Sequence, residues 1–262
     1  KLILLSHDVE GRALIEEALS VKAERRVRLH TPKRGAKLKL IAHAQANARD
    51  ALARRTAESA SQRRLLEGVA RVFGLETAPN RIEVYDNSHI QGSQAVCAMI
   101  VAGPDGLMKN QYRKFTIRDQ SLTPGDDYGM MREVLTRRFS RLLKEDQERT
   151  AGVWPDLVLL DGGRGQLSVV EQVFADLGVT GVALAAIAKG PDRNAGREVF
   201  HLTGRQPFTL PERDPVMFFL QRLRDESHRF VIGSHRTKRR MAMHKSPLDG
   251  IPGVGGRRKK AL

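Results

Sequence analysis

The sequence lacks the features of several large protein classes. Cys97 is its one cysteine, so an internal disulfide and a multi-cysteine zinc site are both excluded. Its uninterrupted apolar runs, such as residues 182–188, fall far short of the roughly 20 residues that a membrane-spanning helix needs. These absences predict a protein that does not enter a membrane and that works in a reducing, cytoplasmic setting.

Acidic residues are scarce relative to basic ones, with 30 Asp and Glu against 45 Lys and Arg. The excess lies at the two ends of the chain. Residues 1–80 hold 16 basic and 9 acidic residues, and residues 222–262 hold 12 and 3, whereas residues 81–221 are balanced at 17 and 18. Basic surface of this extent favours a polyanionic partner, most often nucleic acid. A basic face that is merely solvated is the alternative.

The order of apolar and polar segments predicts a mixed β-sheet flanked by helices. From residue 82 onward, three strand patterns with short connections are followed by alternating helices and strands, which is the layout of the ribonuclease H-like fold. The expected strands are 82–86, 95–102, 108–117, 155–161 and 182–188, with a hairpin at 199–202 and 208–210. The expected helices are 126–146, 166–176 and 215–241, after an upstream region with strands 2–5 and 27–30 and helices 8–23 and 36–73, the last broken near 59–61.

This pattern divides the chain into three parts. Residues 1–78 form an upstream α/β segment, residues 79–241 form the ribonuclease H-like domain, and residues 242–262 form a basic C-terminal extension. Because the sequence opens with Lys1 rather than Met, we expect it to be a piece of a longer protein.

Two aspartates end predicted strands of the central sheet. Period two places Asp86 on the same strand face as Ile82 and Val84, and Asp161 ends the apolar strand of residues 157–160. Ligands gather at the carboxyl ends of strands in open α/β sheets. There are two alternatives. Asp86 could be a strand-end turn residue, and Gly162–Gly165 could be a tight turn rather than a loop open to phosphate or metal.

Two further polar residues lie on helices. Asp127 precedes Met131 by one turn and so shares its inward direction, whereas Asp126 is expected to cap the helix. His228 lies off the apolar face of the last helix, among polar neighbours. The alternative for Asp127 is a first-turn acid that interacts favourably with the helix dipole. The alternative for His228 is a purely structural histidine. Three carboxylates and an imidazole that converge on a sheet edge fit a metal-dependent phosphodiesterase, since carboxylate oxygens suit Mg²⁺.

Five motifs in order resemble the UvrC family, the incision subunits of bacterial nucleotide excision repair. They are Tyr85-Asp-Asn-Ser-His-Ile-Gln-Gly92, Thr123-Pro-Gly-Asp-Asp-Tyr128, Pro155-Asp-Leu-Val-Leu-Leu-Asp-Gly-Gly-Arg-Gly-Gln-Leu167, Ala188-Lys-Gly190 and Arg224-Asp-Glu-Ser-His-Arg229. The resemblance extends over essentially the whole chain. Residues 242–262, with Ser246 to Gly255, are similar to the start of the family's tandem helix-hairpin-helix module, which the resemblance implies is truncated here.

The resemblance implies a DNA endonuclease that makes the incision 5′ of a lesion in double-stranded DNA. Asp86, Asp127, Asp161 and His228 match the family's catalytic positions. The implied cofactor is Mg²⁺ or Mn²⁺, held chiefly by Asp86 and Asp161 and also by His228. The implied partner is the UvrB–DNA complex, formed after UvrA has acted.

The C-terminal extension is a candidate DNA-binding segment. Backbone N–H groups at a helix start bind phosphate without reading sequence, and basic side chains add charge. The residues concerned are Gly253, Gly255, Arg257, Arg258, Lys259 and Lys260. A disordered chain end is the alternative.

Two other functions compete with the endonuclease. A non-catalytic DNA-binding scaffold would keep the fold and the basic ends, but the presence of all four site residues speaks against it. Another ribonuclease H-like enzyme, such as a resolvase or an RNA hydrolase, is the second. Two features favour the UvrC family over another ribonuclease H-like enzyme. A histidine stands in place of a fourth carboxylate, and a helix-hairpin-helix segment follows the domain.

Overall fold

A computed structural model describes residues 1–90, 93–119, 121–123, 125–190 and 198–243. The chain forms two compact units, Lys1–Ser61 and Gln62–Leu262. The division falls inside a helix. The sequence instead predicts a domain boundary after residue 78, and that boundary stays a prediction. The six C-terminal residues proposed to bind DNA lie outside the described residues.

The first unit is a small α/β structure. Strand β1 (Leu2–Leu4) pairs in parallel with β2 (Arg28–His30), and α1 (Arg12–Lys22) connects them. The carboxylate of Glu16 on α1 accepts a hydrogen bond from the backbone N–H of Leu29 at 2.6 Å, so the helix is tied to the second strand. This arrangement agrees with the expected strand–helix–strand order.

Helix α2 runs without interruption from Ala36 to Phe73, so the predicted break near Ser59–Ser61 is wrong. Serine lowers helix propensity only slightly relative to alanine, and the segment contains no proline. The last turns of α2 bury Leu66, Val69 and Phe73 in the core of the second unit. Packing of this end therefore outweighs the weak local signal at the serines.

The second unit is built on a mixed sheet with strand order β5-β4-β3-β7-β8-β9, in which β6 also pairs with β4. Strands β3, β7 and β8 are parallel, and β4 and β9 are antiparallel to their neighbours. The elements are β3 (Ile82–Ile90), β4 (Ser93–Gly103), β5 (Gly106–Leu107), β6 (Arg113–Thr116), α3 (Asp127–Glu145), β7 (Leu157–Asp161), α4 (Arg164–Leu177), β8 (Ala183–Ala188), β9 (Val199–Leu202) and α5 (Pro215–Met243).

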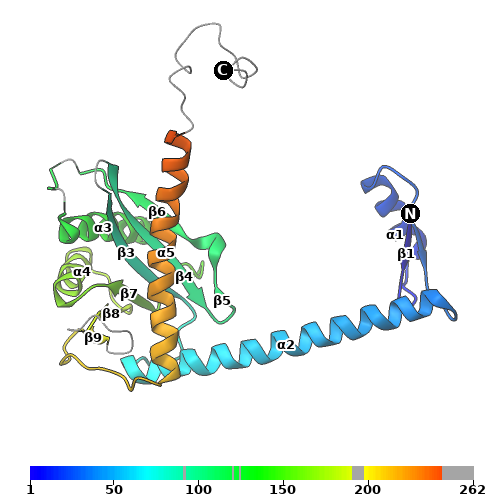
Figure 1. Cartoon of the computed structure of the whole chain (residues 1–262), viewed down its shortest axis with the longest axis horizontal. Helices are drawn as coiled ribbons and strands as arrows, with labels where there is room; N and C mark the ends of the chain where they lie inside the picture. Colours follow the sequence, from blue (N-terminus) through cyan, green and yellow to red (C-terminus); the bar gives the residue numbers. More distant parts are fainter. Residues whose placement is uncertain (91–92, 120, 124, 191–197, 244–262) are drawn as a thin grey trace, which may run out of the picture. The chain divides into compact units, whose positions relative to one another are not determined.

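Helices cover both faces of this sheet (Figure 1). On one face, α5 and the end of α2 pack against Ile82, Val84 and Leu159. On the other face, α3 and α4 pack against Tyr85, Met99 and Leu160. The three-layer arrangement confirms the predicted mixed sheet between helices.

The segment of residues 108–117 differs from the predicted strand, whereas the last helix begins where it is predicted to begin. The predicted strand 108–117 is split into a short 3₁₀ turn, Lys109–Gln111, and β6, because Tyr112 turns inward against Phe230 of α5 instead of continuing the ladder. Helix α5 begins as predicted, since the carboxylate of Asp214 accepts a hydrogen bond from Val216 N–H at 2.7 Å. None of the helices within the described ranges is long and apolar enough to cross a bilayer.

Candidate active site

Asp86 and Asp161 come together because their strands are parallel neighbours in register. The last register pair between β3 and β7 is Tyr85 with Leu160, so the next residue on each strand is one of the two aspartates. Asp86 is 5% exposed and follows Ile82 and Val84 on the face that α5 covers. The alternation of the sequence thus places a carboxylate where an apolar side chain would otherwise continue the core.

Helix α5 brings His228 to these two carboxylates. Its Nδ1 lies 3.0 Å from Asp86 Oδ2, and just over half of its side chain is exposed. Asp86, Asp161 and His228 each offer one ligand atom, and these atoms all lie within 4.8 Å of one another. With Asp86 ionised, Nδ1 is the donor of the hydrogen bond, which fixes the orientation of the imidazole ring toward the sheet edge.

The electrostatics of the cluster favour a bound cation. Burial, followed by the charge of Asp161, raises the pKa of Asp86 to about 6, while His228 acts in the opposite direction. Burial also raises the pKa of Asp161, although Arg224, His228 and Lys189 partly offset the shift. Each carboxylate therefore lacks part of the positive charge that would stabilise its ionised form.

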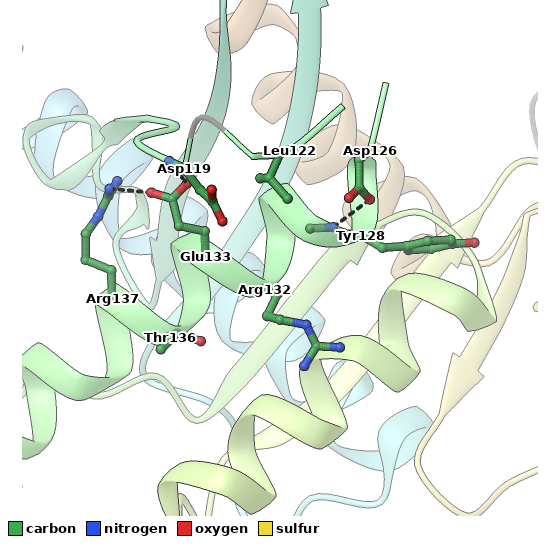
Figure 2. Close-up of a pocket in the computed structure, with 9 residues that line it drawn as sticks. Asp119, Leu122, Asp126, Tyr128, Arg132, Glu133, Thr136 and Arg137 are labelled. Carbon is green, nitrogen blue, oxygen red and sulfur yellow. Dashed lines mark hydrogen bonds and ion pairs between the residues drawn. The ribbon is translucent and has the colours of Figure 1, made fainter. Parts of the chain in front are cut away.

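Asp126 and Asp127 have different surroundings, as predicted. Asp126 caps α3, since its Oδ1 accepts a hydrogen bond from Gly129 N–H at 2.8 Å (Figure 2). Asp127 is the first residue of α3, and its backbone carbonyl accepts a hydrogen bond from the Asn87 side chain at 3.0 Å. The charge of Asp127 contributes to the raised pKa of Asp86. Asp127 does not belong to the group of three ligand atoms within 4.8 Å, so its sharing of a metal or its waters stays a prediction.

Gly162 and Gly163 form the turn between β7 and α4, and Arg164 and Gly165 are the first residues of the helix. A side chain on Gly162 would collide with Gln166, whose Oε1 accepts a hydrogen bond from Gly163 N–H at 3.0 Å. A side chain on Gly165 would collide with the ring of Tyr128. These glycines make room for neighbouring side chains of the chain itself, which supports the tight-turn interpretation.

Sequence reasoning missed the group that holds α5 beside the site. Arg224 is 7% exposed, and its guanidinium contacts Glu198 and Asp225, each at 2.9 Å. Gln221 donates a second hydrogen bond to Glu198 at 2.7 Å. Arg224 lies one turn before His228 on the polar stripe of α5. This spacing is visible in the sequence and could have indicated that Arg224 lies near the site. Glu198 comes from a distant strand end and has no local signal.

Comparison with known proteins places these features in a family. Residues 70–232 match the family model described as the UvrC RNAse H endonuclease domain, and residues 1–55 match the model described as the UvrC ribonuclease H-like domain. The UvrABC system protein C of Paramagnetospirillum magneticum is 64% identical over 99% of this chain, which covers 42% of that relative. The UvrABC system protein C of Chelativorans sp. is 59% identical over the whole chain, again covering 42% of the relative.

A solved structure of human ENDOV overlaps 53% of this chain and 59% of that chain at 16% identity, with a TM-score of 0.34, a likeness too slight to support any argument. The family match rests on sequence, and it extends over the central sheet, the aspartates and the histidine. The chain therefore belongs to the UvrC family, and residues 70–232 are its ribonuclease H-like endonuclease domain.

Proposed function

We propose that this chain is the part of an excision-repair nuclease that hydrolyses a DNA phosphodiester bond 5′ of a lesion, with Asp86, Asp127, Asp161 and His228 as its catalytic residues. The observation that carries the proposal is the convergence of a buried carboxylate, a partly buried carboxylate and an imidazole, whose ligand atoms lie within 4.8 Å of one another at the ends of β3 and β7. The chain spans about two fifths of the length of its curated relatives, so the activity of the whole protein is part of the proposal.

The donor set fits a hard divalent cation, which we propose is Mg²⁺ or Mn²⁺. Two carboxylates supply the oxygen ligands that both ions prefer, and an imidazole nitrogen is acceptable to Mn²⁺. The raised pKa of each aspartate indicates that positive charge is deficient at the site. When bound, the ion would supply a more acidic water and neutralise charge on a phosphoryl group.

The protein's own groups have distinct proposed roles. Asp86 and Asp161 hold the cation, and His228, oriented by its hydrogen bond to Asp86, either adds a nitrogen ligand or moves a proton at its other ring nitrogen. Asp127 contributes negative charge at the entrance of the site from the start of α3. Arg224 acts through position, because its ion pair with Glu198 holds the turn of α5 that precedes His228.

The proposed partners are supported by the family assignment. We propose double-stranded DNA that contains a lesion as the substrate and a UvrB–DNA complex, assembled with UvrA, as the form in which it is presented. The name UvrABC system protein C, carried by the relatives, supports a multi-protein setting. The two glycines Gly253 and Gly255 and the basic residues Arg257, Arg258, Lys259 and Lys260 are proposed to make additional phosphate contacts.

A metal titration combined with an incision assay tests the proposal. Mn²⁺ binding is measured by electron paramagnetic resonance on the full chain, and incision is measured on lesion-containing duplex DNA in the presence of UvrA and UvrB. We expect Mn²⁺ binding by the unsubstituted chain, its loss in Asp161→Asn, and 5′ incision that depends on the same residue. Incision that survives this substitution would overturn the assignment of the site.

The main competitor is a non-catalytic DNA-binding scaffold. That function would need neither the convergence of Asp86 with Asp161 nor the desolvation of both carboxylates. It predicts DNA binding without divalent cations, with no Mn²⁺ signal from the cluster and no incision under any condition, so the same two measurements separate the alternatives.

A further inference from the structure

A groove lined by basic residues lies between β6 and the second half of α3, away from the cluster of Asp86, Asp161 and His228. Its third wall is the loop at residues 151–153. Glu145 is the single acidic side chain among the described residues that line it. We call it the arginine groove, after its arginines Arg81, Arg113, Arg118, Arg137, Arg138 and Arg141.

This concentration of charge is not a consequence of composition. Residues 81–221 contain 17 basic and 18 acidic residues, so the sequence of this region predicts no net charge. Folding nevertheless gathers six arginines on one surface, while two of the acidic residues, Asp86 and Asp161, face the candidate active site. A segregated surface of this kind attracts an anion even when the whole region is neutral.

Some of these arginines serve the fold. Arg81 and Arg138 pair with the fully buried Glu83 at 2.8 and 2.7 Å, so they form the floor of the groove. Arg137 pairs with Glu133 at 2.8 Å and lies over the ring of Phe115. A ligand would therefore meet these three groups already neutralised in part.

Three arginines remain for an external partner. Arg113 donates to the carbonyl oxygens of Asn110 and Tyr112 and forms no ion pair with a described acid. Arg118 engages Glu133 through its backbone N–H. Arg141 pairs with Glu145, but about 70% of its side chain is exposed, so that contact is weak and readily exchanged. Their guanidinium groups suit phosphate oxygens, which accept two parallel hydrogen bonds.

The groove continues along α3 toward the N-terminal end of the helix, where Asp127 lies. A second hollow, lined by Asp126, Tyr128 and Arg132, shares Arg137 with the arginine groove, and Figure 2 shows it running beside the first turns of the helix. At 1.5 Å per residue, Arg137 and Arg141 lie roughly 15 and 21 Å along the helix from Asp127. These distances correspond to about four to six base pairs of duplex DNA.

Three carboxylates line the second hollow, and each has a partner within the chain. Asp126 accepts from Gly129 N–H, Asp119 accepts from the hydroxyl of Ser121 at 2.6 Å, and Glu133 pairs with Arg137. Of these three charges, that of Glu133 is offset by a cation, whereas Asp126 and Asp119 accept from neutral donors and stay negative. The proposed phosphate contacts therefore lie in the arginine groove and not in the second hollow.

We propose that the arginine groove binds the phosphate backbone of duplex DNA. The identity of the polyanion rests on the proposed function, whereas the binding surface rests on the groove itself. An acidic protein is the less favoured partner, because no exposed large hydrophobic side chain of the described residues lines the groove and protein interfaces depend on such anchors.

The test compares two triple substitutions that remove the same charge from the full chain. The groove variant carries Arg113→Gln, Arg118→Gln and Arg141→Gln. The control variant carries Lys109→Gln, Arg205→Gln and Arg222→Gln, at exposed positions elsewhere in the second unit. Affinity for a fluorescent duplex is measured in EDTA at salt concentrations from about 50 to about 300 mM, the range over which phosphate binding weakens strongly. Incision cannot interfere without divalent ions, and thermal melting checks that each variant is folded.

We expect the groove variant to bind at least about tenfold more weakly at moderate salt and the control variant to change by less than about twofold. The slope of log affinity against log salt should decrease in magnitude by about 0.9 for each phosphate that is no longer bound, thus by roughly 2 to 3 for the groove variant. A third variant, with lysine at the same three groove positions, should retain affinity within a few-fold, because charge is kept.

Two outcomes overturn the proposal. Equal decreases in the groove and control variants would show that only net charge matters, and unchanged affinity in the groove variant would show that the groove serves another partner, such as an acidic protein. Failure of the proposed endonuclease is distinguishable, because an unsubstituted chain that binds DNA through the groove but never incises it would overturn the activity and leave the groove intact.

Discussion

Strand β3 carries two buried carboxylates, Glu83 and Asp86, whose surroundings are opposite. They are three residues apart and so point to opposite faces of the sheet; Glu83 is fully buried and Asp86 is 5% exposed. Glu83 meets the guanidinium groups of Arg81 and Arg138 and accepts a hydrogen bond from the Tyr85 hydroxyl at 2.6 Å. Asp86 meets the imidazole of His228 and a second carboxylate, Asp161.

The difference shows that burial alone does not distinguish a structural carboxylate from a functional one. The charge of Glu83 is neutralised by the fold, because two cations and a hydroxyl surround it. The charge of Asp86 is left partly uncompensated, and its raised pKa records the deficit. A group that the chain does not neutralise is one that a cation from outside can stabilise.

The largest expected effect is the loss of incision in Asp86→Asn. Removal of one carboxylate charge weakens the cation site, so we expect 5′ incision with Mg²⁺ to fall by about 10⁴-fold or more, which corresponds to about 5 kcal/mol of transition-state stabilisation. The melting temperature should stay the same or rise, because repulsion with Asp161 is also removed. The incision rate and a melting curve measure the two effects.

The matched control for this variant is Asp126→Asn. Asparagine is as good an N-cap as aspartate, so loss of a nearby charge that only caps α3 should leave incision within a few-fold of the unsubstituted chain. If both variants lose activity to the same degree, the reduction reflects general electrostatics and the comparison between compensated and uncompensated carboxylates fails.

The next effect is the loss of stability in Glu83→Gln. This substitution leaves the cations of Arg81 and Arg138 in a poorly solvated environment without their partner, and breaking a buried ion pair from one side costs about 3–5 kcal/mol. Denaturant unfolding should show this decrease in the free energy of unfolding. Tyr85→Phe, which removes one hydrogen bond to the same carboxylate, should cost only about 1 kcal/mol. Equal costs for the two would mean that the arginines find water instead.

A smaller effect is a pH dependence of stability that originates at Asp86. Its pKa, raised to about 6, means that the folded chain holds the proton more tightly than the unfolded chain, whose aspartate has a pKa near about 3.9. The contribution of Asp86 to the free energy of unfolding is therefore highest below about pH 4 and decreases as the pH rises to about 6, by up to about 3 kcal/mol.

Melting curves recorded in EDTA from about pH 4 to about pH 7 measure this slope. Asp86→Asn should flatten it, because the substituted side chain does not titrate. A slope that is unchanged in this variant would place its origin in another group, such as Asp161, whose pKa is also raised.

Divalent cations should stabilise the unsubstituted chain by a comparable amount. A ligand that binds only the folded state, present at about 100 times its dissociation constant, adds about 2.7 kcal/mol to the free energy of unfolding. The melting temperature should rise with Mn²⁺ concentration, and it should not rise in Asp86→Asn. Stabilisation that persists in the variant would mean that the ion binds elsewhere.

The sequence predicted most of the sheet and four residues that converge at its edge, of which three bring their ligand atoms together. Asp86, Asp161 and His228 were recognisable because strand ends and a polar helix stripe are local patterns. The Glu83 network was not recognisable, because Arg138 lies 55 residues away on α3 and its pairing depends on helix packing. The arginine groove was hidden for a related reason, since the net charge of residues 81–221 conceals how folding separates the two signs.

Two other contacts could not be predicted from local sequence patterns either. They are the packing of Tyr112 on Phe230 and the ion pair of Arg224 with Glu198. Tyr112 lies where the expected strand 108–117 is split into a 3₁₀ turn and β6, and its ring packs on Phe230. Phe230 is so distant in the sequence that no local pattern encodes this interaction. Glu198 reaches Arg224 in the same way. Local periodicity therefore predicts elements and their exposed ends, whereas long-range pairing determines which charges remain available.

The smallest expected effect concerns the pair of Arg141 and Glu145, which extends the comparison to the surface. Both side chains are more than half exposed, so water already solvates each charge and the pair contributes at most about 0.5 kcal/mol. Arg141→Gln should therefore leave the free energy of unfolding unchanged within that range, in contrast to Glu83→Gln. The same substitution should weaken DNA binding measurably, because a phosphate that approaches the groove meets a guanidinium that is only loosely held by its neighbour. A stability loss above about 1 kcal/mol, beyond what an exposed pair contributes, with unchanged DNA affinity would reverse this assignment and make Arg141 a structural residue, as Arg138 is.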